Sequence, residues 1–365
     1  MHILFDHQAF QGQKYGGISR YYYELITRLM SEKDFEISLF QGLNVNRFPF
    51  EKYEKEYKHF ISNNIRSIPR GERYLSILNH FFLSRFARRI KPDILHETYF
   101  GNPCPKMKMK RVLTVYDMIH EIYPDYFTSN NDATLNKRNA VDRVDKVISI
   151  SHHTKKDLMD LFSVPESKIE VIHLASSLRP HPVPDTPIHP RPFLLHVGPR
   201  LRYKNFKTLL KAFAGSPKIY ENFDLVNFGG PHWTGDEQEI FRKYGIENRV
   251  HLRGGGDEDL IQYYQAARAF VFPSMYEGFG IPVLEAMGLN CPVICANVSS
   301  LPEIGGDAAL YFSPNDESEL ETCLLRLCLD DSFRYSLIEK GRRQQKGFSW
   351  SDATKRTAEL YRSIL

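Results

Sequence analysis

The most informative part of the sequence is F-P-S-M-Y-E-G-F-G-I-P-V-L-E-A-M-G-L-N-C-P, residues 272–292. A short apolar strand ends at Pro273, a loop with two glycines follows, and a helix begins near Pro282, whose fixed φ suits a first helical turn. Such a loop brings bare backbone amides and the positive end of the helix close to a phosphate. The stretch therefore predicts an anion-binding loop at the carboxyl end of a buried strand.

Short β-rich runs alternate with helical patterns on both sides of this stretch. In the second half, strands are expected at residues 193–197, 224–228, 250–253, 269–272, 292–296 and 309–312. In the first half, strands are expected at residues 2–6, 36–40, 94–98, 111–117, 144–151 and 169–174. This alternation is typical of parallel βαβ units, so the sequence predicts an α/β protein with two Rossmann-like, doubly wound sheets.

The segment between the two predicted sheets is rich in proline. Six prolines lie between Arg179 and Pro192, a density that removes amide donors and opposes helix formation. We interpret 179–192 as a linker between an N-terminal domain, 1–178, and a C-terminal domain, 193–349; a long surface loop is the alternative. The last residues, 350–365, have helical spacing and predict a terminal helix. Two such sheets facing each other leave a cleft at the carboxyl ends of their strands.

Composition supports two domains and excludes several classes of protein. The chain has 365 residues, 42% of them apolar and 25% charged, and this length is too great for a single domain with one ordinary core. A formal charge of +4 is too small for a dedicated nucleic-acid binder. Five cysteines, without a CxxC pair, argue against a disulfide framework or a zinc ribbon and favour the reducing cytoplasm. Residues 1–7 predict a first strand instead of a signal peptide, and no apolar run is long enough to span a membrane.

Two groups of charged residues in the second half are suited to a phosphorylated sugar ligand. Glu277 and Glu285 are eight positions apart, so they can address two parts of one extended ligand through hydroxyl groups. Arg200 and Lys204 follow Gly198 at the end of a predicted strand, where they can neutralise a diphosphate. The alternatives are two solvated glutamates beside a tight turn and a solvated basic loop.

Three residues of the first half are weaker indications of a site. Gly16 and Gly17 open a helix soon after the first strand, but the GxGxxG spacing of a dinucleotide site is missing, which also argues against a dehydrogenase. His120 follows the strand that ends at Asp117 and can reach the cleft; a structural histidine is the alternative.

The amphipathic stretch 74–90 allows two interpretations. It ends in Arg85, Arg88, Arg89 and Lys91, and with Lys106, Lys108, Lys110 and Arg111 it can contact an anionic membrane. A core-facing helix with solvated cations is the favoured interpretation.

Taken together, the motifs resemble the retaining GT-B glycosyltransferases of family 4, in their group of bacterial surface-polysaccharide enzymes. The resemblance covers essentially the whole chain. The matching segments are 16–20, 116–120, 149–151, 197–198, 204–205, 272–274, 277–282, 285–287 and 300–303.

The resemblance implies a GT-B fold, a donor site in the second domain, no cofactor or obligatory metal, and a C-terminal helix, 350–365, that packs back on the first domain. It implies that Arg200 and Lys204 hold the donor diphosphate and that Glu285 binds the ribose. Glu277 is expected to bond the hydroxyls of the transferred sugar, with backbone amides from Gly278, Phe279 and Gly280.

In the first domain, the resemblance implies that His120 lies beside the reacting centre. It also implies that Gly16 and Gly17 allow this domain to close over the phosphates. One position departs from the family pattern: many relatives carry arginine directly before the matched lysine, whereas Tyr203 stands here. Arg200 must then supply the guanidinium group.

The implied activity is retaining transfer of a hexose from a nucleotide-diphosphate sugar to a glycan or a lipid-linked acceptor, in lipopolysaccharide or capsule synthesis. GDP-mannose is the favoured donor and a UDP-sugar the alternative. The enzyme is expected in the cytoplasm, with peripheral contact at the inner face of the cell membrane. Other hypotheses are a GT-B sugar-nucleotide epimerase or phosphorylase and a non-catalytic nucleotide-binding subunit; no motif marks the pyridoxal-phosphate lysine that a phosphorylase needs.

Overall fold

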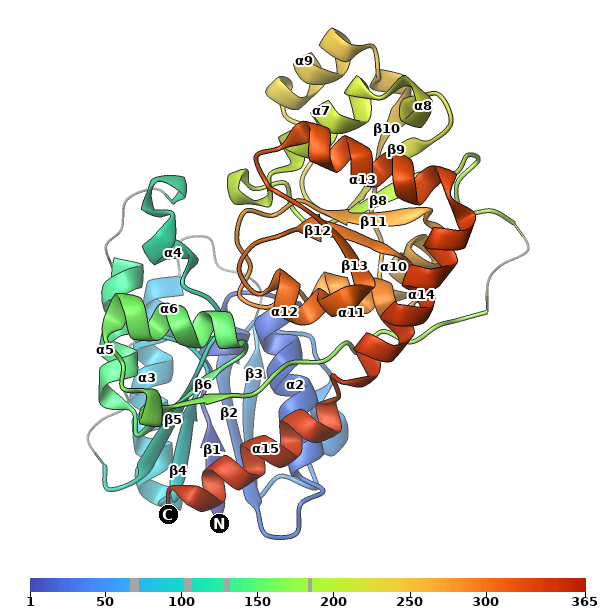
Figure 1. Cartoon of the computed structure of the whole chain (residues 1–365). Coiled ribbons are helices and arrows are strands. Elements are labelled where there is room, and N and C mark those ends of the chain that lie inside the picture. The colour runs from blue at the N-terminus through green and yellow to red at the C-terminus, as the bar shows by residue number, and fades with distance from the viewer. Residues whose placement is uncertain (66–71, 102–106, 128–131, 183–185) are drawn as a thin grey trace. The chain divides into compact units, whose positions relative to one another are not determined.

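The structure is a computed structural model that describes residues 1–65, 72–101, 107–127, 132–182 and 186–365 (Figure 1). Cys104 and Lys106, and residues 183–185 of the predicted linker, lie outside the described residues. The chain divides into two compact units. The first contains Met1–Leu174 and Trp350–Leu365, and the second contains Ala175–Ser349.

The first unit is built on a parallel sheet whose described strands, seven in all, follow the order β3-β2-β1-β4-β5-β6-β7. These strands are β1 (His2–Phe5), β2 (Glu36–Asn44), β3 (His59–Asn64), β4 (Ile94–Glu97), β5 (Lys110–Val115), β6 (Lys146–Ser149) and β7 (Ile169–Val171). The helices are α1 (Gln8–Gln11), α2 (Gly17–Leu29), α3 (Glu72–Ile90), α4 (Ile119–Ile122), α5 (Asp132–Arg143), α6 (His152–Phe162) and α15 (Trp350–Ser363). The sheet is doubly wound, as predicted.

The second unit repeats this plan with six described strands in the order β10-β9-β8-β11-β12-β13, all parallel. The strands are β8 (Phe193–Val197), β9 (Asp224–Phe228), β10 (Val250–Arg253), β11 (Ala269–Phe272), β12 (Val293–Ala296) and β13 (Ala309–Phe312). The helices are α7 (Phe206–Gly215), α8 (Pro217–Tyr220), α9 (Gly235–Tyr244), α10 (Asp257–Ala266), α11 (Ile281–Gly288), α12 (Leu301–Gly305), α13 (Glu317–Leu329) and α14 (Asp331–Lys346). The strand order reverses between β8 and β11, and ligands of such sheets bind at this point.

Local sequence explains why several elements begin where they do. The Ser151 hydroxyl accepts a hydrogen bond of 3.0 Å from the amide of Thr154 and so caps the start of α6. Thr234 and Glu237 form a capping box at the start of α9, where each side chain binds the other's backbone amide. Strand β3 was not predicted, because it is a largely polar edge strand without a continuous apolar face.

The proline-rich segment belongs to the second unit in its described part, and the division between the units falls at Leu174 and Ala175. The carbonyl of His181 accepts a hydrogen bond of 2.9 Å from the amide side chain of Gln265 in α10. His189 lies 2.8 Å from a carboxylate oxygen of Asp224 at the start of β9. The segment is therefore held against the second unit at α10 and at β9.

The last helix, α15, packs on the first unit, next to α2 (Figure 1). Its Trp350 and Tyr361 are buried. The Tyr361 hydroxyl lies 2.5 Å from Nδ1 of His96 in β4, and Nε2 of the same ring lies 2.9 Å from the Thr114 hydroxyl in β5. Burial lowers the pKa of His96 to about 3, so the ring is neutral and exchanges hydrogen bonds with both hydroxyls.

Helix α3 has an inner and an outer face. Leu83, Phe86 and Ala87 pack on Leu4 and Phe40 in the core, as the core-facing interpretation predicted. The outer face also carries large apolar side chains, which that interpretation did not predict. The exposed residues are Tyr74, Ile77, Leu78, Phe81 and Phe82. Among the described residues, none of the helices combines the length and the apolar character needed to cross a bilayer.

We predict that Tyr361→Phe lowers the free energy of unfolding by about 1–3 kcal/mol, because the buried Nδ1 of His96 loses its partner. Urea unfolding followed by far-UV circular dichroism measures the change. Tyr335→Phe is the matched control, since the Tyr335 side chain is 62% exposed. Equal stability of both variants would contradict a role for this contact in holding α15.

Candidate functional site

Three glycines shape the carboxyl ends of β8 and β9 in the second unit. Gly198, Gly229 and Gly230 have φ values of +106°, +86° and +85°, a region that favours glycine. A Cβ atom on Gly230 would lie 3.0 Å from the Cα atom of Pro199 and 3.2 Å from Nη1 of Arg200. The two loops therefore approach each other through bare backbone, at the edge of the sheet where the strand order reverses.

Arg200 is held firmly inside the second unit. Its side chain is only 2% exposed, and Nε donates to Oε1 of Glu237 at 2.6 Å. Nη2 donates to the carbonyl of Pro231 at 2.8 Å, and the guanidinium lies 4.2 Å from the centre of the Trp233 ring. Nη1 is buried without a hydrogen-bond partner among the described residues. The sequence did not predict this pairing, because Glu237 belongs to a helix 37 positions away.

Lys204 and Glu277 form an ion pair of 2.6 Å between Nζ and Oε1. Both side chains are mostly buried, and the ammonium group also lies 5.3 Å from the centre of the Phe272 ring. Lys204 follows β8 and Glu277 follows β11, which are neighbouring parallel strands. The structure thus brings together two residues that the sequence placed in separate motifs.

The loop that carries Glu277, Gly278 and Phe279 is fixed by two serines before α12. The Ser300 hydroxyl donates to the carbonyls of Glu277 and Phe279, at 2.8 and 2.9 Å. The amide of Glu277 donates to the Ser299 hydroxyl at 2.9 Å. Ser300 belongs to a motif seen in the sequence, but nothing in the sequence indicated that it holds this loop.

The same loop ends at Gly280, whose φ is +99°. A Cβ atom there would lie 2.8 Å from Cδ2 of Leu301, so both conformation and space favour glycine. Helix α11 begins at the next residue and carries Glu285, whose Oε2 accepts a hydrogen bond of 3.3 Å from the hydroxyl of Tyr264. Burial, aided by the charge of Glu285, raises the pKa of Tyr264 well above its usual value, so this hydroxyl stays a donor.

Near Nη1 of Arg200 in the fold, two atoms that follow or end neighbouring strands are also buried without hydrogen-bond partners among the described residues: Nε2 of His196 in β8 and the hydroxyl of Ser274 after β11. Nδ1 of His196 lies 2.6 Å from the side-chain oxygen of Asn227. Burial lowers the pKa of His196 to about 4, and the positive charges of Lys204 and Arg200 act in the same direction. Buried polar groups without partners are rare, so this edge of the sheet has the character of a polar ligand site.

The predicted residues of the first unit lie at the carboxyl edge of its own sheet. Gly16 precedes α2 in an extended conformation, and Gly17 is the first residue of that helix. A Cβ atom on Gly16 would lie 2.0 Å from the side-chain oxygen of Gln13. His120 lies in α4, and its ring centre is 4.1 Å from that of Phe127. Gly16, Gly17 and His120 thus belong to the first unit, whereas Lys204 and Glu277 belong to the second.

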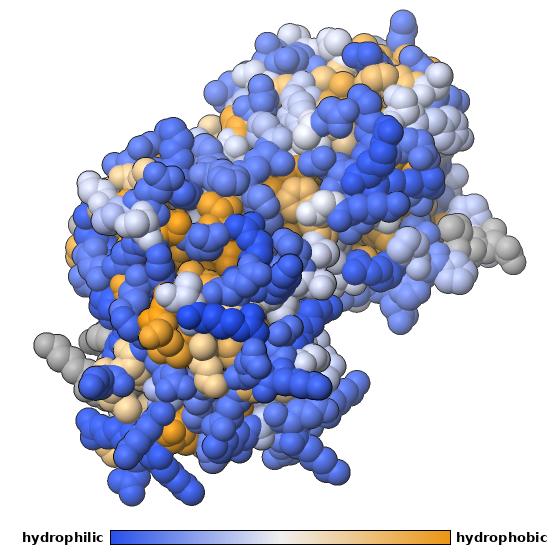
Figure 2. Space-filling model, turned by 60° about the horizontal axis from the view of Figure 1, so that its bottom comes forward, coloured by the Kyte–Doolittle hydropathy of each residue, from blue (hydrophilic) through white to orange (hydrophobic). Residues whose placement is uncertain are grey.

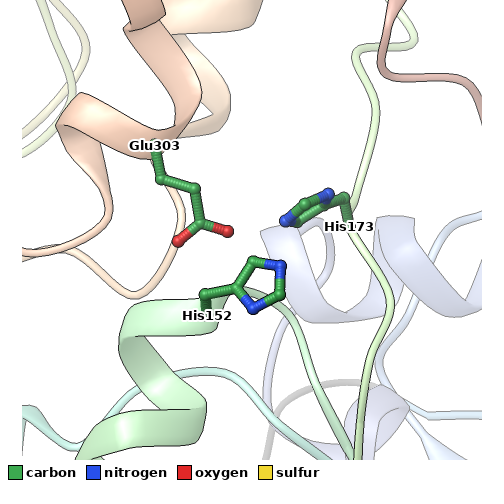
Figure 3. Close-up of side chains that lie close together, drawn as sticks. All are labelled: His152, His173 and Glu303. Atoms are coloured by element: carbon green, nitrogen blue, oxygen red, sulfur yellow. The ribbon is translucent and has the colours of Figure 1, made fainter.

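The carboxyl edge of the first sheet carries two further histidines that the sequence did not predict as site residues. His152 begins α6 and His173 follows β7; their ring centres lie 5.7 Å apart at an angle of 70° (Figure 3). Glu303, also drawn in Figure 3, comes from α12 of the second unit.

One cluster in the second unit has the composition of a metal site: His189, Asp224 and His251. Nε2 of both histidines lies close to Oδ2 of Asp224, at 2.8 and 3.1 Å. Arg191 and Arg249 contact Oδ1 of the same carboxylate, at 3.1 and 3.5 Å. Two positive charges on the only carboxylate of the cluster oppose a bound cation, so we interpret the cluster as a hydrogen-bonded anchor for the proline-rich segment.

Both parts of the chain match models of known protein families. Residues 184–344 match the family model described as glycosyl transferases group 1, and residues 15–178 match that of glycosyltransferase family 4. The chain is 30% identical over 372 residues to the O-antigen chain mannosyltransferase B of Escherichia coli, covering 95% of this chain and 96% of that protein.

Solved structures support the fold. A sucrose-phosphate synthase from Thermosynechococcus elongatus superimposes with a TM-score of 0.76 at 20% identity, covering 100% of this chain and 98% of the other. WaaG, a glycosyltransferase of lipopolysaccharide biosynthesis, superimposes with a TM-score of 0.73 at 15% identity, covering 99% of both chains. At these identities the likeness shows the fold alone, which is the predicted GT-B fold with two Rossmann-like domains.

The packing of Arg200 predicts that Glu237→Ala destabilises the second unit by roughly 3–5 kcal/mol, because a buried cation loses its counter-charge. The chain has two tryptophans, Trp233 here and Trp350 in the first unit. In a Trp350→Phe background, the fluorescence of Trp233 therefore reports urea unfolding of this unit alone. Glu239→Ala, on the exposed side of the same helix, is the control, and equal midpoints for the two variants would refute the role of the pair.

Proposed function

The chain belongs to the group 1 and family 4 glycosyltransferases, and from this membership we propose that it transfers a hexose, with retention, from a nucleotide-diphosphate sugar to a glycan or lipid-linked acceptor in bacterial polysaccharide synthesis. The observation that carries the proposal is the ion pair between Lys204 and Glu277 at the carboxyl ends of β8 and β11. A cation at this position can bind the negative diphosphate, and a carboxylate at this position can accept hydrogen bonds from sugar hydroxyls.

We propose that the positive groups of the second unit stabilise the leaving diphosphate. As the bond from the anomeric carbon to the phosphate oxygen breaks, negative charge grows on the diphosphate. Lys204, Nη1 of Arg200 and backbone amides from Gly278 to Gly280 are suited to receive this charge. Fixed donors of this kind often supply the largest single contribution to catalysis.

In this scheme Lys204 exchanges Glu277 for the donor phosphate, and the freed carboxylate of Glu277 accepts hydrogen bonds from the hydroxyls of the transferred sugar. Glu285 binds the ribose. His120 lies beside the reacting centre, and Gly16 and Gly17 let the first domain close over the phosphates. These roles follow the family resemblance and remain proposals for each residue.

Retention without a covalent intermediate follows from the roles proposed for the two carboxylates. Glu277 accepts hydrogen bonds from the hydroxyls of the transferred sugar and Glu285 binds the ribose, so neither is assigned the role of a glycosidase nucleophile. We propose a front-side displacement in which the acceptor oxygen forms the new glycosidic bond as the diphosphate leaves. The departing phosphate oxygen takes the proton of the acceptor hydroxyl, which balances the step.

GDP-mannose is the donor that we propose first. The support is the full-length similarity to a protein named O-antigen chain mannosyltransferase B. A UDP-sugar is the alternative donor. The proposed acceptor is a growing glycan on a lipid carrier, which the enzyme approaches from the cytoplasm as a peripheral protein at the inner face of the membrane. No cofactor or obligatory metal is proposed.

We predict that Lys204→Ala and Glu277→Ala each lower kcat at least about 100-fold, the usual loss when one charge-stabilising group is removed. Transfer from a labelled donor to an acceptor glycan measures the rate, and far-UV circular dichroism verifies the fold. Lys207→Ala is the matched control, because Lys207 is exposed in the first turn of α7. Near-normal rates in both site variants would refute their roles.

A panel of nucleotide diphosphates tests the donor. We predict that GDP raises the melting temperature of the protein more than UDP or ADP at equal concentration, because a ligand that binds only the folded state stabilises it by about 2.7 kcal/mol at 100 times its Kd. Lys204→Ala is expected to lose most of this effect. A larger increase in melting temperature with UDP would indicate a UDP-sugar as the donor. No increase with any nucleotide would favour a non-catalytic protein.

A further inference from the structure

The outer face of helix α3 in the first unit is apolar and unpartnered among the described residues. Tyr74, Ile77, Leu78, Phe81 and Phe82 are 73%, 57%, 46%, 62% and 48% exposed. Their spacing of three and four positions places them on one stripe of the helix. We call these five residues the α3 apolar face. Contiguous exposed apolar surface of this kind marks an interaction site in a folded protein.

A hollow of about 660 Å³ adjoins the α3 apolar face and shares Phe82 with it. Its apolar lining comes from Phe40, Leu43, Ile61 and Phe86, and its polar lining includes Arg85, Arg88 and Arg89. On the face of the molecule drawn in Figure 2, hydrophobic atoms of the first unit reach the surface beside hydrophilic ones. The hollow therefore suits an apolar chain that lies next to a negative group.

Cations border the apolar surface on the side where α3 ends. Arg85, Arg88 and Arg89 are exposed in the last turns of the helix. A second hollow shares Arg88 with the first and adds Lys91, Lys108 and Lys110. It also contains Met107, Met109 and the acidic residues Asp93 and Asp145, of which Asp145 pairs with Lys110 at 3.2 Å. Arg111, predicted as a surface cation, is instead buried against Glu97 at 3.2 Å.

We infer that the α3 apolar face and its bordering cations form the surface by which this protein docks on an anionic lipid bilayer. Exposed aromatic rings and branched chains enter the boundary between headgroups and acyl chains, while guanidinium groups bind lipid phosphates. Charge complementarity favours an anionic bilayer, because the exposed cations that border the apolar face match the negative phosphates that lie directly above the acyl chains. The inference rests on the proposed function, which brings the enzyme to a lipid-linked acceptor at the membrane but names no surface for the contact.

Co-sedimentation of the full chain with vesicles tests the inference. We expect the protein to bind vesicles of phosphatidylcholine and phosphatidylglycerol in equal parts, to lose this binding at high salt, and not to bind phosphatidylcholine alone. The double variant Ile77→Ser/Phe81→Ser is expected to lower the partition coefficient at least about tenfold. Arg88→Gln/Arg89→Gln is expected to lower it roughly 25-fold at low salt, about fivefold for each cation.

Matched controls lie in the second unit. Leu329→Ser/Tyr335→Ser removes two equally exposed apolar side chains, and Arg242→Gln/Lys243→Gln removes two exposed cations. Both are expected to bind vesicles like the unmodified protein. Equal binding by the α3 variants, or equal binding to neutral and anionic vesicles, would overturn the inference. A self-associated species that Ile77→Ser/Phe81→Ser disperses, without vesicle binding, would assign the face to a second copy of the chain.

The same variants separate this inference from the proposed function. Stabilisation by nucleotide diphosphates and transfer to a soluble acceptor glycan are expected to remain within about twofold in the α3 variants, since α3 belongs to the first unit and the donor groups to the second. Nucleotide binding without vesicle binding overturns the docking inference alone. Vesicle binding without any nucleotide binding or transfer overturns the proposed function and leaves the docking surface in place.

Discussion

The contact between Lys204 and Glu277 depends on the strand order of the second sheet. The two residues are 73 positions apart, yet they meet because β8 and β11 are neighbouring parallel strands and each is followed directly by its loop. A mostly buried ammonium group needs a negative partner, and Glu277 supplies it. In the proposed scheme a diphosphate takes the place of that partner, because the cation is already at the edge of the sheet where ligands of such folds bind.

The two cations of the site are held in different ways. Arg200 is fixed by Glu237, by a backbone carbonyl and by the Trp233 ring, whereas its Nη1 has no hydrogen-bond partner in the part of the chain that the structure describes. Lys204 is held by Glu277, and in the proposed scheme it exchanges this partner for the donor phosphate. A fixed guanidinium and a lysine on a flexible stem would suit the proposed leaving group, because the first is pre-organised and the second can follow the phosphate.

Sequence alone predicted the sheets well and the contacts within the site only in part. Buried strands such as β8 and β11 have continuous apolar runs, so the sequence predicted both strands and the loops that follow them. The contact between Lys204 and Glu277 required the strand order, which the structure supplied. Strand β3 escaped prediction because an exposed edge strand lacks such a run. The Arg200 to Glu237 pair and the serines that hold the loop of Glu277 depend on how loops fold against each other. These contacts are determined by tertiary packing, which the periodicity of apolar residues in the sequence does not predict.

Helix α3 shows the same limit of periodicity in a different form. A repeat of three and four positions identifies an apolar stripe, but 74–90 carries apolar residues on two faces, and only burial distinguishes the one that packs on the sheet. The chain keeps the exposed stripe beside arginines on the unit that does not hold Lys204 and Glu277. Each unit has its own sheet and core, so the proposed lipid-docking surface and the proposed phosphate-binding loops can each be maintained without constraining the packing of the other.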